Sequence, residues 1–503
     1  MRLRLPVVQQ RRAGTIASTA AILLLLLSGA PGPRPAYAAA PGPRGAHQVL
    51  ADLMRKEPYL VHPGVPAQMK VVWQLTATDT CRIAWGTDTA CALGSMRTSE
   101  YGPDHQHAFT IDGLAPGTKY HYRVTQGGVV RRGSFRSAPA PTAAHLKFFA
   151  YGDTRTYPAV HDQVAGGVLA TVAADPEYQT FDLSAGDLVN DGNLESDWTG
   201  QFFSPSYPNI RGEMANLSIL SAMGNHEGTG ALFAKYFPYP FVAGRYWSFD
   251  YGPAHVVVVD QFTGYGAGSP QHQWIAADLA ATTKTWKFLL LHEPGWSAGG
   301  GHPNNTTVQT VLQPLCEQYG VAIVFGGHNH YYARAVVNGV THVTAGGGGA
   351  PLHTPDLGYP NVVTAASAHH FCTVSIEHDL LTLRALTPAG AVLDSFTLQR
   401  FGPATGVGVV GPAGLALARP VPNPGRGTTL LRFSLPRAGR ARLEIVDLSG
   451  RRVWRTEADL GAGAHEWRWD GHDGAGADAG AGLYFVRLVT PWGTRTQRLV
   501  RLR

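Results

Sequence analysis

The sequence lacks several motifs, and each absence argues against a class of protein. The 503 residues include only four cysteines and no C-x-x-C motif, which argues against a zinc ribbon or a thioredoxin-type redox centre. No G-x-S-x-G motif is present, so Ser/His/Asp catalysis is unsupported. Only 15% of the residues are charged and 44% are hydrophobic, which is typical of a folded chain with buried cores. The length predicts two to four domains.

The first 38 residues have the pattern of a secretory signal. Arginines precede an apolar run from Ala20 to Leu27, and Ala36-Tyr37-Ala38 forms an A-x-A cleavage site. The apolar run is well short of the roughly 20 residues that a membrane-spanning helix needs, so a single span is the weaker alternative. We expect residues 1–38 to be a signal peptide and the mature chain to be exported to the periplasm, the cell surface or the medium, without a transmembrane helix.

The charge distribution does not indicate a nucleic-acid partner. Lys and Arg number 41 and Asp and Glu number 35, but five of the arginines lie in the predicted signal. The two signs therefore nearly balance in the rest of the chain. Residues 415–503 hold 15 arginines, no lysine and 8 acidic residues, a composition at least as typical of a solvated β surface as of a nucleic-acid-binding one.

The four cysteines are an even number in a chain that we expect to be exported, which makes two disulfides plausible. Cys81 and Cys91 are close enough in sequence to join the strands of one hairpin. Cys316 and Cys372 would then pair with each other, although four cysteines allow three connectivities.

Composition and periodicity divide the chain into regions. Residues 56–137 contain short β-like runs such as MKVVWQL and KYHYRV between Gly/Pro turns, which predicts a β sandwich. In residues 146–400, apolar runs alternate with helix-like stretches, which predicts helices flanking sheets. After a Gly/Pro/Val-rich linker at 402–418, residues 419–503 again show short alternating strands.

Three helices are expected in the central region. The first spans Pro158 to Ala174. The second begins after Ser269, a suitable N-cap, with Pro270 at its first position. The third spans about residues 308–319 and ends at Gly320, a residue suited to a helix C-cap.

Five apolar, strand-like runs of the central region end in Asp, Asn or His. Ligands of α/β proteins gather at the carboxyl ends of strands, and two metal ions about 3.5–4 Å apart need a shared carboxylate to reduce their repulsion. Each residue alone would more often be an ordinary hydrogen-bonded side chain, but five motifs in this order are difficult to assign to chance. The runs KFFAYGD, FDLSAGD, LSILSAMGNHE, WKFLLLH and VAIVFGGHNH deliver Asp153, Asp187, Asn225, His226, His292, His328 and His330.

The order GD, GD, GNHE, LHEP, GHNH resembles the five-block signature of calcineurin-like metallophosphoesterases. The segment LAPGTKYHYRV resembles part of a fibronectin type III domain. Together with the GHNHYYAR continuation and the GGGGAP loop at 346–351, it makes the chain most similar to the purple acid phosphatase branch. The resemblance covers about residues 56–400 and implies a four-layer αββα core with two metal ions after the β sandwich. With the strand pattern of residues 419–503, we expect a multidomain protein: a β sandwich, the αββα core and a C-terminal β sandwich.

The resemblance also implies a role for each site residue. One metal takes Asp153, Asp187 and His330, and the second takes Asp187 as bridge with Asn225, His292 and His328. His226 matches the residue that protonates or stabilises the leaving-group oxygen. His302 matches a histidine that contacts the substrate phosphate, although an ordinary loop histidine is the alternative. Asp, Asn and His ligands suit Fe, Zn and Mn alike.

Two positions depart from the pattern of the family. The purple acid phosphatase tyrosine, three residues after the bridging aspartate, is Asn190 here, so we do not expect a purple protein. The histidine found in many other members, two residues after the first aspartate, is Arg155. The fourth ligand of the first metal could be Asn190, His161 or water. Arg155 could hold a phosphate oxygen, and an ordinary structural salt bridge is the equal alternative.

These expectations define a function with two rivals. We expect an exported phosphatase in which a metal-bridging hydroxide attacks phosphomonoesters, while Asn225, Arg155 and His302 neutralise phosphoryl charge. The rivals are a phosphodiesterase acting on nucleotides or lipid headgroups, and a surface adhesion protein with an inactive core. The PNP, WRWDGHD and GLYFVRL segments resemble the flagellar hook-capping Ig-like domain and type IX secretion sorting domains, which would imply secretion machinery or cell-surface anchoring as partners.

Overall fold

The computed structural model describes residues 52–400 and 415–502. The predicted signal peptide at 1–38 and most of the predicted linker at 402–418 lie outside the described residues. Among the described residues, no helix combines the length and the apolar character that a bilayer-spanning helix requires.

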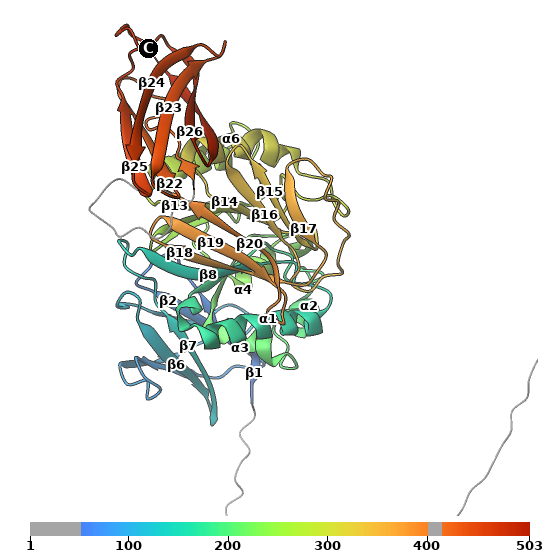
Figure 1. Cartoon of the computed structure of the whole chain (residues 1–503). Helices are drawn as coiled ribbons and strands as arrows, with labels where there is room; N and C mark the ends of the chain where they lie inside the picture. The colour runs from blue at the N-terminus through green and yellow to red at the C-terminus, as the bar shows by residue number, and fades with distance from the viewer. Residues whose placement is uncertain (1–51, 401–414, 503) are drawn as a thin grey trace, which may run out of the picture. The chain divides into compact units, whose positions relative to one another are not determined.

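A nine-stranded mixed sheet forms one layer of the central region (Figure 1). Its middle strands β8, β9 and β10 are parallel, and the outer strands are added by antiparallel pairing, apart from the parallel contact of β10 with β1. In order across the sheet, the strands are β20 (Val392–Gln399), β19 (Leu380–Leu386), β18 (Phe371–Glu377), β8 (His145–Tyr151), β9 (Phe181–Ser184), β10 (Ser218–Ser221), β1 (Met54–Val61), β2 (Met69–Leu75) and β5 (Gln106–Ile111).

A seven-stranded sheet forms the second layer. Its strands β12, β13, β14 and β16 are parallel, and β11, β15 and β17 are added in antiparallel pairs. In order, the strands are β11 (Trp247–Tyr251), β12 (Ala254–Val258), β13 (Trp286–Leu290), β14 (Ile323–Gly326), β16 (Val340–Ala345), β15 (Tyr332–Val337) and β17 (Val362–Ala366).

The two sheets face each other through an aromatic core. Side chains alternate between the two faces of a strand, so in β8 Phe148 points toward the second sheet and Phe149 points away from it. Phe148 meets Phe288 of β13 with ring centroids 5.5 Å apart, and Phe181 of β9 meets Phe249 of β11 at 5.9 Å. Fully buried aromatic rings of this kind contribute most of the apolar area that stabilises the layer contact.

Helices cover the outer faces of both sheets and complete the αββα arrangement. On the nine-stranded sheet, Val164 and Val168 of α1 (Pro158–Ala174) pack on Phe149, and α3 (Pro208–Asn216) lies beside α1 (Figure 1). On the seven-stranded sheet, α5 (Pro270–Ala281), η4 (Val308–Leu312) and α6 (Gln313–Tyr319) pack on β12, β13 and β14. Shorter helical segments of the connections are η1 (Pro176–Tyr178), α2 (Glu195–Asp197), η2 (Trp198–Phe202), η3 (Asn225–Glu227) and α4 (Ala231–Tyr236).

The three predicted helices are confirmed, with one difference. The bounds of α1 match the prediction, and α5 begins at Pro270 after Ser269, whose hydroxyl accepts the N–H of His272 at 3.2 Å. The third stretch is divided into a π-helical turn, η4, and the α-helix α6. It ends at Gly320, which adopts φ 71°, a left-handed conformation that glycine reaches without the steric cost of a Cβ.

The expected N-terminal β domain is present, but it shares a sheet with the core. Strands β4 (Gly94–Thr98), β3 (Cys81–Gly86), β6 (Lys119–Gln126) and β7 (Val129–Arg136) form a separate four-stranded sheet in that order. Its apolar face packs on Val71 and Trp73 of β2. Because β1 pairs with β10 at Leu60 and Ser218, the second layer of this domain is the edge of the nine-stranded sheet.

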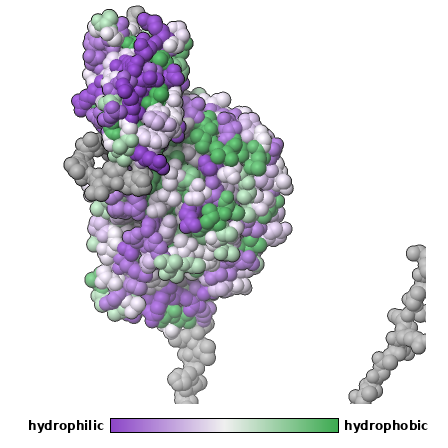
Figure 2. All heavy atoms as spheres, in the orientation of Figure 1, coloured by the Kyte–Doolittle hydropathy of each residue, from purple (hydrophilic) through white to green (hydrophobic). Residues whose placement is uncertain are grey.

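Residues 415–502 form a β sandwich with its own core. Leu431, Phe433 and Trp469 of one sheet pack against Leu443 and Val486 of the other. In the face that Figure 2 shows, the surface of this domain is mainly hydrophilic, as expected for a solvated arginine-rich β surface. The strands of the two sheets are β21 (Ala416–Leu417), β22 (Thr429–Leu435) and β25 (Gly463–Trp469), and β24 (Arg452–Leu460), β23 (Gly439–Asp447), β26 (Gly482–Thr490) and β27 (Gly493–Arg501).

The predicted disulfides are wrong, because all four cysteines are buried and free. Cys81 begins β3, whereas Cys91 packs beside Gly86 at the other end of that strand. Five residues of strand separate their backbones by roughly 16 Å, and a disulfide requires Cα atoms within about 7 Å. Cys316 lies on the outer, helical side of the seven-stranded sheet, and Cys372 lies in the core between the two sheets.

Candidate metal centre

The six predicted metal ligands all follow strands of the two central sheets. Asp153 follows β8, Asp187 follows β9, and Asn225 follows β10. His292 follows β13 and His328 follows β14, with His330 just before β15. Since β8, β9 and β10 are parallel neighbours, and β13 and β14 are also parallel neighbours, each set of strand ends shares one edge of its sheet.

The ligands of the first predicted metal meet in one buried group. The side-chain donor atoms of Asp153, Asp187 and His330 lie within 4.8 Å of one another, and all three residues are buried. His330 Nε2 is 3.6 Å from Asp153 Oδ1. Two buried carboxylates this close repel each other, and a cation between them would relieve that repulsion. The group therefore fits a metal ion.

The ligands of the second predicted metal gather around His292. Its Nε2 lies 2.9 Å from Asn225 Oδ1, 3.1 Å from His328 Nδ1 and 3.4 Å from Asp187 Oδ1. Asp187 therefore takes part in both groups, as a bridging carboxylate must.

Hydrogen bonds outside the cluster orient the histidine rings. His292 Nδ1 is 2.8 Å from the carbonyl oxygen of Ala185, and His330 Nδ1 is 2.7 Å from that of Pro351. A carbonyl only accepts, so each Nδ1 carries the proton and donates it. This leaves the lone pair on Nε2, the atom directed at the cluster, in the form that a metal requires.

Burial holds His328 and His330 neutral. It lowers the pKa of His328 to about 2 and that of His330 to about 3. Burial and the charge of Asp187 raise the pKa of Asp153. For Asp187, burial also raises the pKa, but the neighbouring side chains of His292, His226 and Arg155 and the N–H of His226 outweigh it, so the pKa of Asp187 is lowered. The bridging residue is therefore the carboxylate that ionises most readily.

The glycines of the motifs make room for the carboxylates. A Cβ on Gly224 would lie 2.2 Å from Asp187 Oδ1, and a Cβ on Gly327 would lie 2.2 Å from Asp153 Oδ2. Asp153, Asp187 and His328 themselves adopt φ values of 57°, 56° and 65°. Non-glycine residues in this left-handed region cost of order 1–3 kcal/mol each and concentrate at functional sites.

Glu227, the last residue of GNHE, was not predicted as a site residue. It is fully buried, and its carboxylate accepts three backbone N–H groups: Leu188 and Gly224 at 2.7 Å and Asp187 at 3.0 Å. Burial, followed by the charge of Asp187, raises the pKa of Glu227, and the three hydrogen bonds act in the opposite direction. Glu227 thereby joins the loop after β10 to the loop after β9.

Arg155 contacts ligands of the first group. Its Nε is 3.2 Å from Asp187 Oδ2, and its Nη2 is 3.3 Å from His330 Nε2. Of the three predicted sources of a fourth ligand, His161 is turned elsewhere, since its Nε2 lies 3.3 Å from the hydroxyl of Tyr151. The amide oxygen of Asn190 accepts a hydrogen bond from Thr156 Oγ1 at 3.3 Å. The structure thus shows the predicted salt bridge of Arg155 and disfavours His161 as a ligand.

The two predicted non-ligand histidines also lie at the cluster. His226 Nδ1 is 2.6 Å from the carbonyl oxygen of Asn190, and its Nε2 is 3.9 Å from Asp187 Oδ2. The ring of His302 stacks on His328 with centroids 3.8 Å apart and planes 26° apart. Both residues are partly exposed, which a substrate contact requires.

His353 is a further residue that the sequence did not single out. Its ring stacks on His330 at 4.1 Å, and its Nδ1 accepts the backbone N–H of His330 at 3.2 Å. The only signal in the sequence is its position two residues after the GGGGAP loop.

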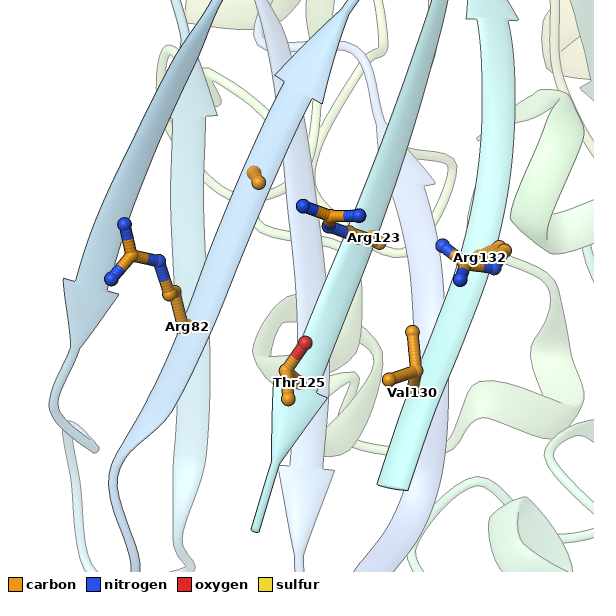
Figure 3. Close-up of a pocket in the computed structure, with 6 residues that line it drawn as sticks. Arg82, Arg123, Thr125, Val130 and Arg132 are labelled. Carbon is orange, nitrogen blue, oxygen red and sulfur yellow. The ribbon is translucent and has the colours of Figure 1, made fainter. Parts of the chain in front are cut away.

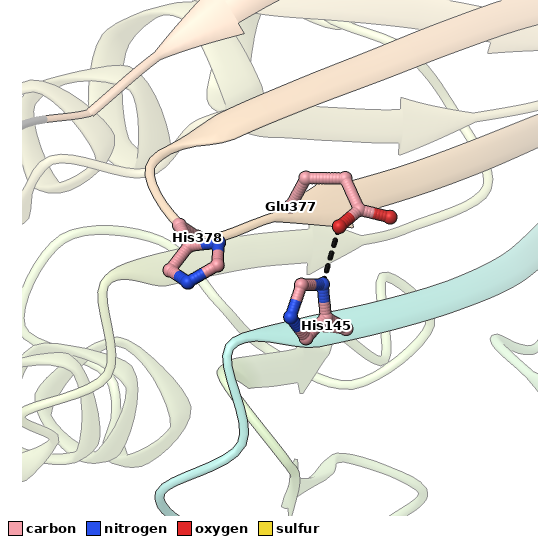
Figure 4. Close-up of side chains that lie close together, drawn as sticks. All are labelled: His145, Glu377 and His378. Atoms are coloured by element: carbon pink, nitrogen blue, oxygen red, sulfur yellow. Dashed lines mark hydrogen bonds and ion pairs between the residues drawn. The ribbon is translucent and has the colours of Figure 1, made fainter. Parts of the chain in front are cut away.

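A second group of potential metal ligands lies on the surface. His145, Glu377 and His378 have donor atoms within 4.8 Å of one another, and His145 Nδ1 contacts the Glu377 carboxylate (Figure 4). His145 begins β8, whereas Asp153 follows its far end, roughly 25 Å away along the strand direction. No sequence motif marks this group, because its members come from the start of β8, the end of β18 and the turn after β18.

Comparisons with known proteins agree with this geometry. The family Calcineurin-like phosphoesterase matches residues 169–332. A purple acid phosphatase of Glycine max is 26% identical over 350 residues, which cover 63% of this chain and 72% of that protein. Purple acid phosphatase 22 of Arabidopsis thaliana is 34% identical over 116 residues, covering 21% of this chain and only 27% of the relative.

Solved structures show the same fold. Purple acid phosphatase PPD1 from seeds of yellow lupin (Lupinus luteus) superposes with a TM-score of 0.58 at 19% identity, over 68% of this chain and 74% of that one. The structure of PhoD gives a TM-score of 0.54 at 13% identity, over 70% of this chain and 93% of that one.

The expected architecture and the expected relationship are therefore confirmed, whereas the link of residues 419–503 to secretion sorting domains stays a prediction. The family implies a dinuclear metal centre, for which the residues above are the candidate ligands. Residues 169–332 of this chain form a calcineurin-like phosphoesterase domain, which supports a phosphoester hydrolase, and the chain is similar to the purple acid phosphatases.

Proposed function

We propose that this chain is an exported phosphatase that hydrolyses phosphomonoesters at a two-metal site. The observation that carries the proposal is the position of Asp187. It belongs to the buried group with Asp153 and His330 and also lies 3.4 Å from His292, so one carboxylate can serve both ions. Two metal ions held there would supply Lewis acidity to a phosphate ester and lower the pKa of water at the site.

The protein residues around the cluster have separate tasks in this proposal. Asn225 is exposed and belongs to the second group, so its amide oxygen can bind a metal ion while its amide NH₂ donates to a phosphoryl oxygen. The guanidinium of Arg155 has a side-chain exposure of 14%, and its fork of N–H donors matches two phosphate oxygens. His302, held by stacking on His328, presents a further donor.

His226 is placed to serve the leaving group. Its Nδ1–H donates to the carbonyl oxygen of Asn190, which fixes the ring and directs Nε2 toward Asp187. A proton on Nε2 can pass to the departing alkoxide, which is the role of a general acid.

The decisive experiment compares p-nitrophenyl phosphate with bis(p-nitrophenyl) phosphate on metal-reconstituted protein. We expect the monoester to be hydrolysed faster, and we expect Asn225→Ala to lower its kcat by about 10²–10³-fold. His145→Ala, in the surface group, serves as the matched control and should leave the rate unchanged. Faster diester hydrolysis would assign a phosphodiesterase with the same ligands. Hydrolysis of neither ester would favour a surface-binding protein.

Metal content tests the ligand assignment independently of activity. We expect about two equivalents of Fe, Zn or Mn per chain in the unaltered protein, and loss of both equivalents in Asp187→Ala because the bridge is shared. Loss of a single equivalent would show that Asp187 serves one ion only.

Export rests on residues 1–38, and a secretion or anchoring role rests on the motifs of residues 419–503. Cleavage after Ala38 predicts that the chain recovered outside the cytoplasm begins at Ala39, which N-terminal mass spectrometry would detect. An uncleaved chain retained in the cytoplasm would contradict export. Removing residues 415–503 should abolish surface anchoring if the C-terminal domain is a sorting signal, and should leave localisation unchanged if it is a spacer.

A further inference from the structure

Four arginines share the outer face of the sheet β4-β3-β6-β7. Arg82 of β3 stands directly opposite Arg97 of β4, and Arg123 of β6 stands directly opposite Arg132 of β7. The register also places Thr125 beside Arg82 and Ala84 beside Arg123, so small side chains lie between the two arginine pairs. The alternation of β6, with Tyr122 and Val124 buried, confirms that Arg123 and Thr125 point to the outside.

This arrangement is unfavourable for the protein alone. Like charges that stand directly opposite each other across strands destabilise a sheet. Among the described residues, none of these four arginines has a carboxylate partner within 4.0 Å, and the one side-chain bond is that of Arg82 to Ser95 Oγ at 2.5 Å. Asp88, in the turn after β3, accepts the N–H of Ala90 and makes no ion pair.

The patch encloses a cavity. It has a volume of about 180 Å³ and is lined by Arg82, Ala84, Arg123, Thr125, Val130 and Arg132. Figure 3 shows the guanidinium of Arg123 between those of Arg82 and Arg132, with Thr125 below them. Since a water molecule in the liquid occupies about 30 Å³, the cavity has room for a tetrahedral anion and several waters. Ala84 and Thr125 leave this space because their side chains are short.

We propose that this face of the N-terminal β domain binds phosphate or sulfate groups, at a site separate from the metal centre. A guanidinium presents paired N–H donors that match two oxygens of such an anion, which favours phosphate and sulfate over a simple halide. The threonine hydroxyl adds a neutral donor. Four positive charges spread over neighbouring strands, which lie about 4.8 Å apart, suit a ligand that carries more than one anionic group. The proposal goes beyond the hydrolytic function and does not depend on it.

The test compares two triple variants of the full mature chain, loaded with metal. In the patch variant, Arg82, Arg123 and Arg132 are replaced by Gln. In the control, three exposed arginines of the C-terminal domain, Arg440, Arg451 and Arg468, are replaced by Gln, which changes the net charge equally. The probes are inorganic sulfate and inositol hexasulfate, neither of which is a phosphate ester, and binding is measured by calorimetry.

We expect the Kd for inositol hexasulfate to rise at least 10-fold in the patch variant and to stay within about twofold in the control. Inorganic sulfate should bind more weakly than inositol hexasulfate, because it engages one guanidinium pair at a time. Its Kd should also be higher for the patch variant than for the control and the unaltered chain. Equal Kd values for inorganic sulfate and inositol hexasulfate would show that the site holds a single anion. That result would overturn the proposal that the ligand carries more than one anionic group. Hexasulfate binding by the patch variant as tight as that of the unaltered chain would overturn the proposal.

Thermal unfolding gives a second measurement that detects a folding defect. At low salt, the patch variant should unfold at a higher temperature than the unaltered chain, because the opposed arginines are gone, and sulfate should no longer raise that temperature. If NaCl of equal ionic strength raises the unfolding temperature of the unaltered chain as much as sulfate does, the effect is general charge screening. That result would overturn a specific anion site. Hydrolysis of p-nitrophenyl phosphate should be the same in all three proteins.

Discussion

The backbone N–H of Asp187 donates to Glu227 Oε2 at 3.0 Å, so the proposed bridging ligand is positioned by a carboxylate that lies outside both ligand groups. The other oxygen of Glu227 accepts from Leu188. Through these bonds, the loop after β9 and the loop after β10 hold each other in place. The geometry of Asp187 and of Asn225 is thus set by one buried side chain, Glu227, within their own motifs.

Glu227→Gln should therefore weaken metal binding without removing a ligand. Its amide NH₂ would face at least one of the backbone N–H donors and leave it unpaired, which costs about 1–3 kcal/mol of the free energy of unfolding. Metal affinity should fall by about 10–100-fold. Urea unfolding and metal titration measure the two effects. Glu177→Gln, an exposed carboxylate of η1, is the control, and unchanged metal affinity in Glu227→Gln would refute the positioning role.

Gly224→Ala should disrupt the same loop by overpacking. The new Cβ would lie 2.2 Å from Asp187 Oδ1 and 2.5 Å from the Asp187 nitrogen, so the bridging carboxylate must move. We expect about 1–3 kcal/mol less stability and loss of at least one metal equivalent. Gly264→Ala is the matched control, because a Cβ there meets nothing within 4 Å. Equal metal content in the two variants would contradict the steric argument.

His226→Ala separates leaving-group protonation from metal binding. A general acid matters most for poor leaving groups, so kcat should fall about 10²–10⁴-fold for an alkyl phosphate and much less for p-nitrophenyl phosphate. Metal content should not change, since His226 is outside both ligand groups. Equal losses for the two substrates, measured side by side, would exclude proton donation by this residue.

Arg155→Ala distinguishes a substrate contact from a structural salt bridge. If the guanidinium holds a phosphate oxygen, KM for the monoester should rise roughly 10-fold or more, and Arg155→Lys should recover part of it. If it only pairs with Asp187, stability should fall while KM stays constant. Steady-state kinetics and chemical unfolding of both variants decide between these results.

His255 should make stability depend on pH. Burial lowers its pKa, but hydrogen bonds to Asp250 at 2.7 Å and Asp278 at 2.9 Å outweigh burial, so the folded-state pKa is raised above 6.5. Its contribution is complete below about pH 6.5 and is lost as the pH rises through the raised pKa. His255→Gln should cost about 1.5–3 kcal/mol at pH 5.5 and less at pH 8.5. His465→Gln, at a partly exposed position without a carboxylate partner among the described residues, is the control, and a pH-independent cost would disprove the charged pairing.

The sequence predicted that the six candidate ligands lie close together because each follows a recognisable local pattern. Asp153 and Asp187 come after a glycine that ends an apolar strand, and parallel strands bring such ends together. The start of α5 at Pro270 was predictable for a similar reason, since the Ser269 cap acts within one helical turn.

Other features depended on contacts that local sequence does not encode. The sequence does not distinguish the roles of His161 and His353. In the structure, His161 of α1 contacts the hydroxyl of Tyr151, whereas His353 stacks on His330 at the site. The spacing of Cys81 and Cys91 suits a hairpin, but Cys91 lies in the turn between β3 and β4, beside Gly86, whereas Cys81 begins β3 at the far end of the strand, too far away for a disulfide. The inclusion of β1 in the core sheet could not be predicted from nearby residues, because it depends on pairing with β10, which is distant in the sequence.

The pairing of β1 with β10 also constrains the order of folding. Synthesis begins at the N-terminus, so β1 is made early. Its neighbour in the sheet, Ser218 opposite Leu60, is made much later. Until then the β1–β2–β5 ribbon presents an unpaired edge, and such edges invite association with other chains. A partner that covers nascent strands until the αββα core has formed would therefore raise the yield of this protein, more than it would for a protein whose N-terminal domain folds alone.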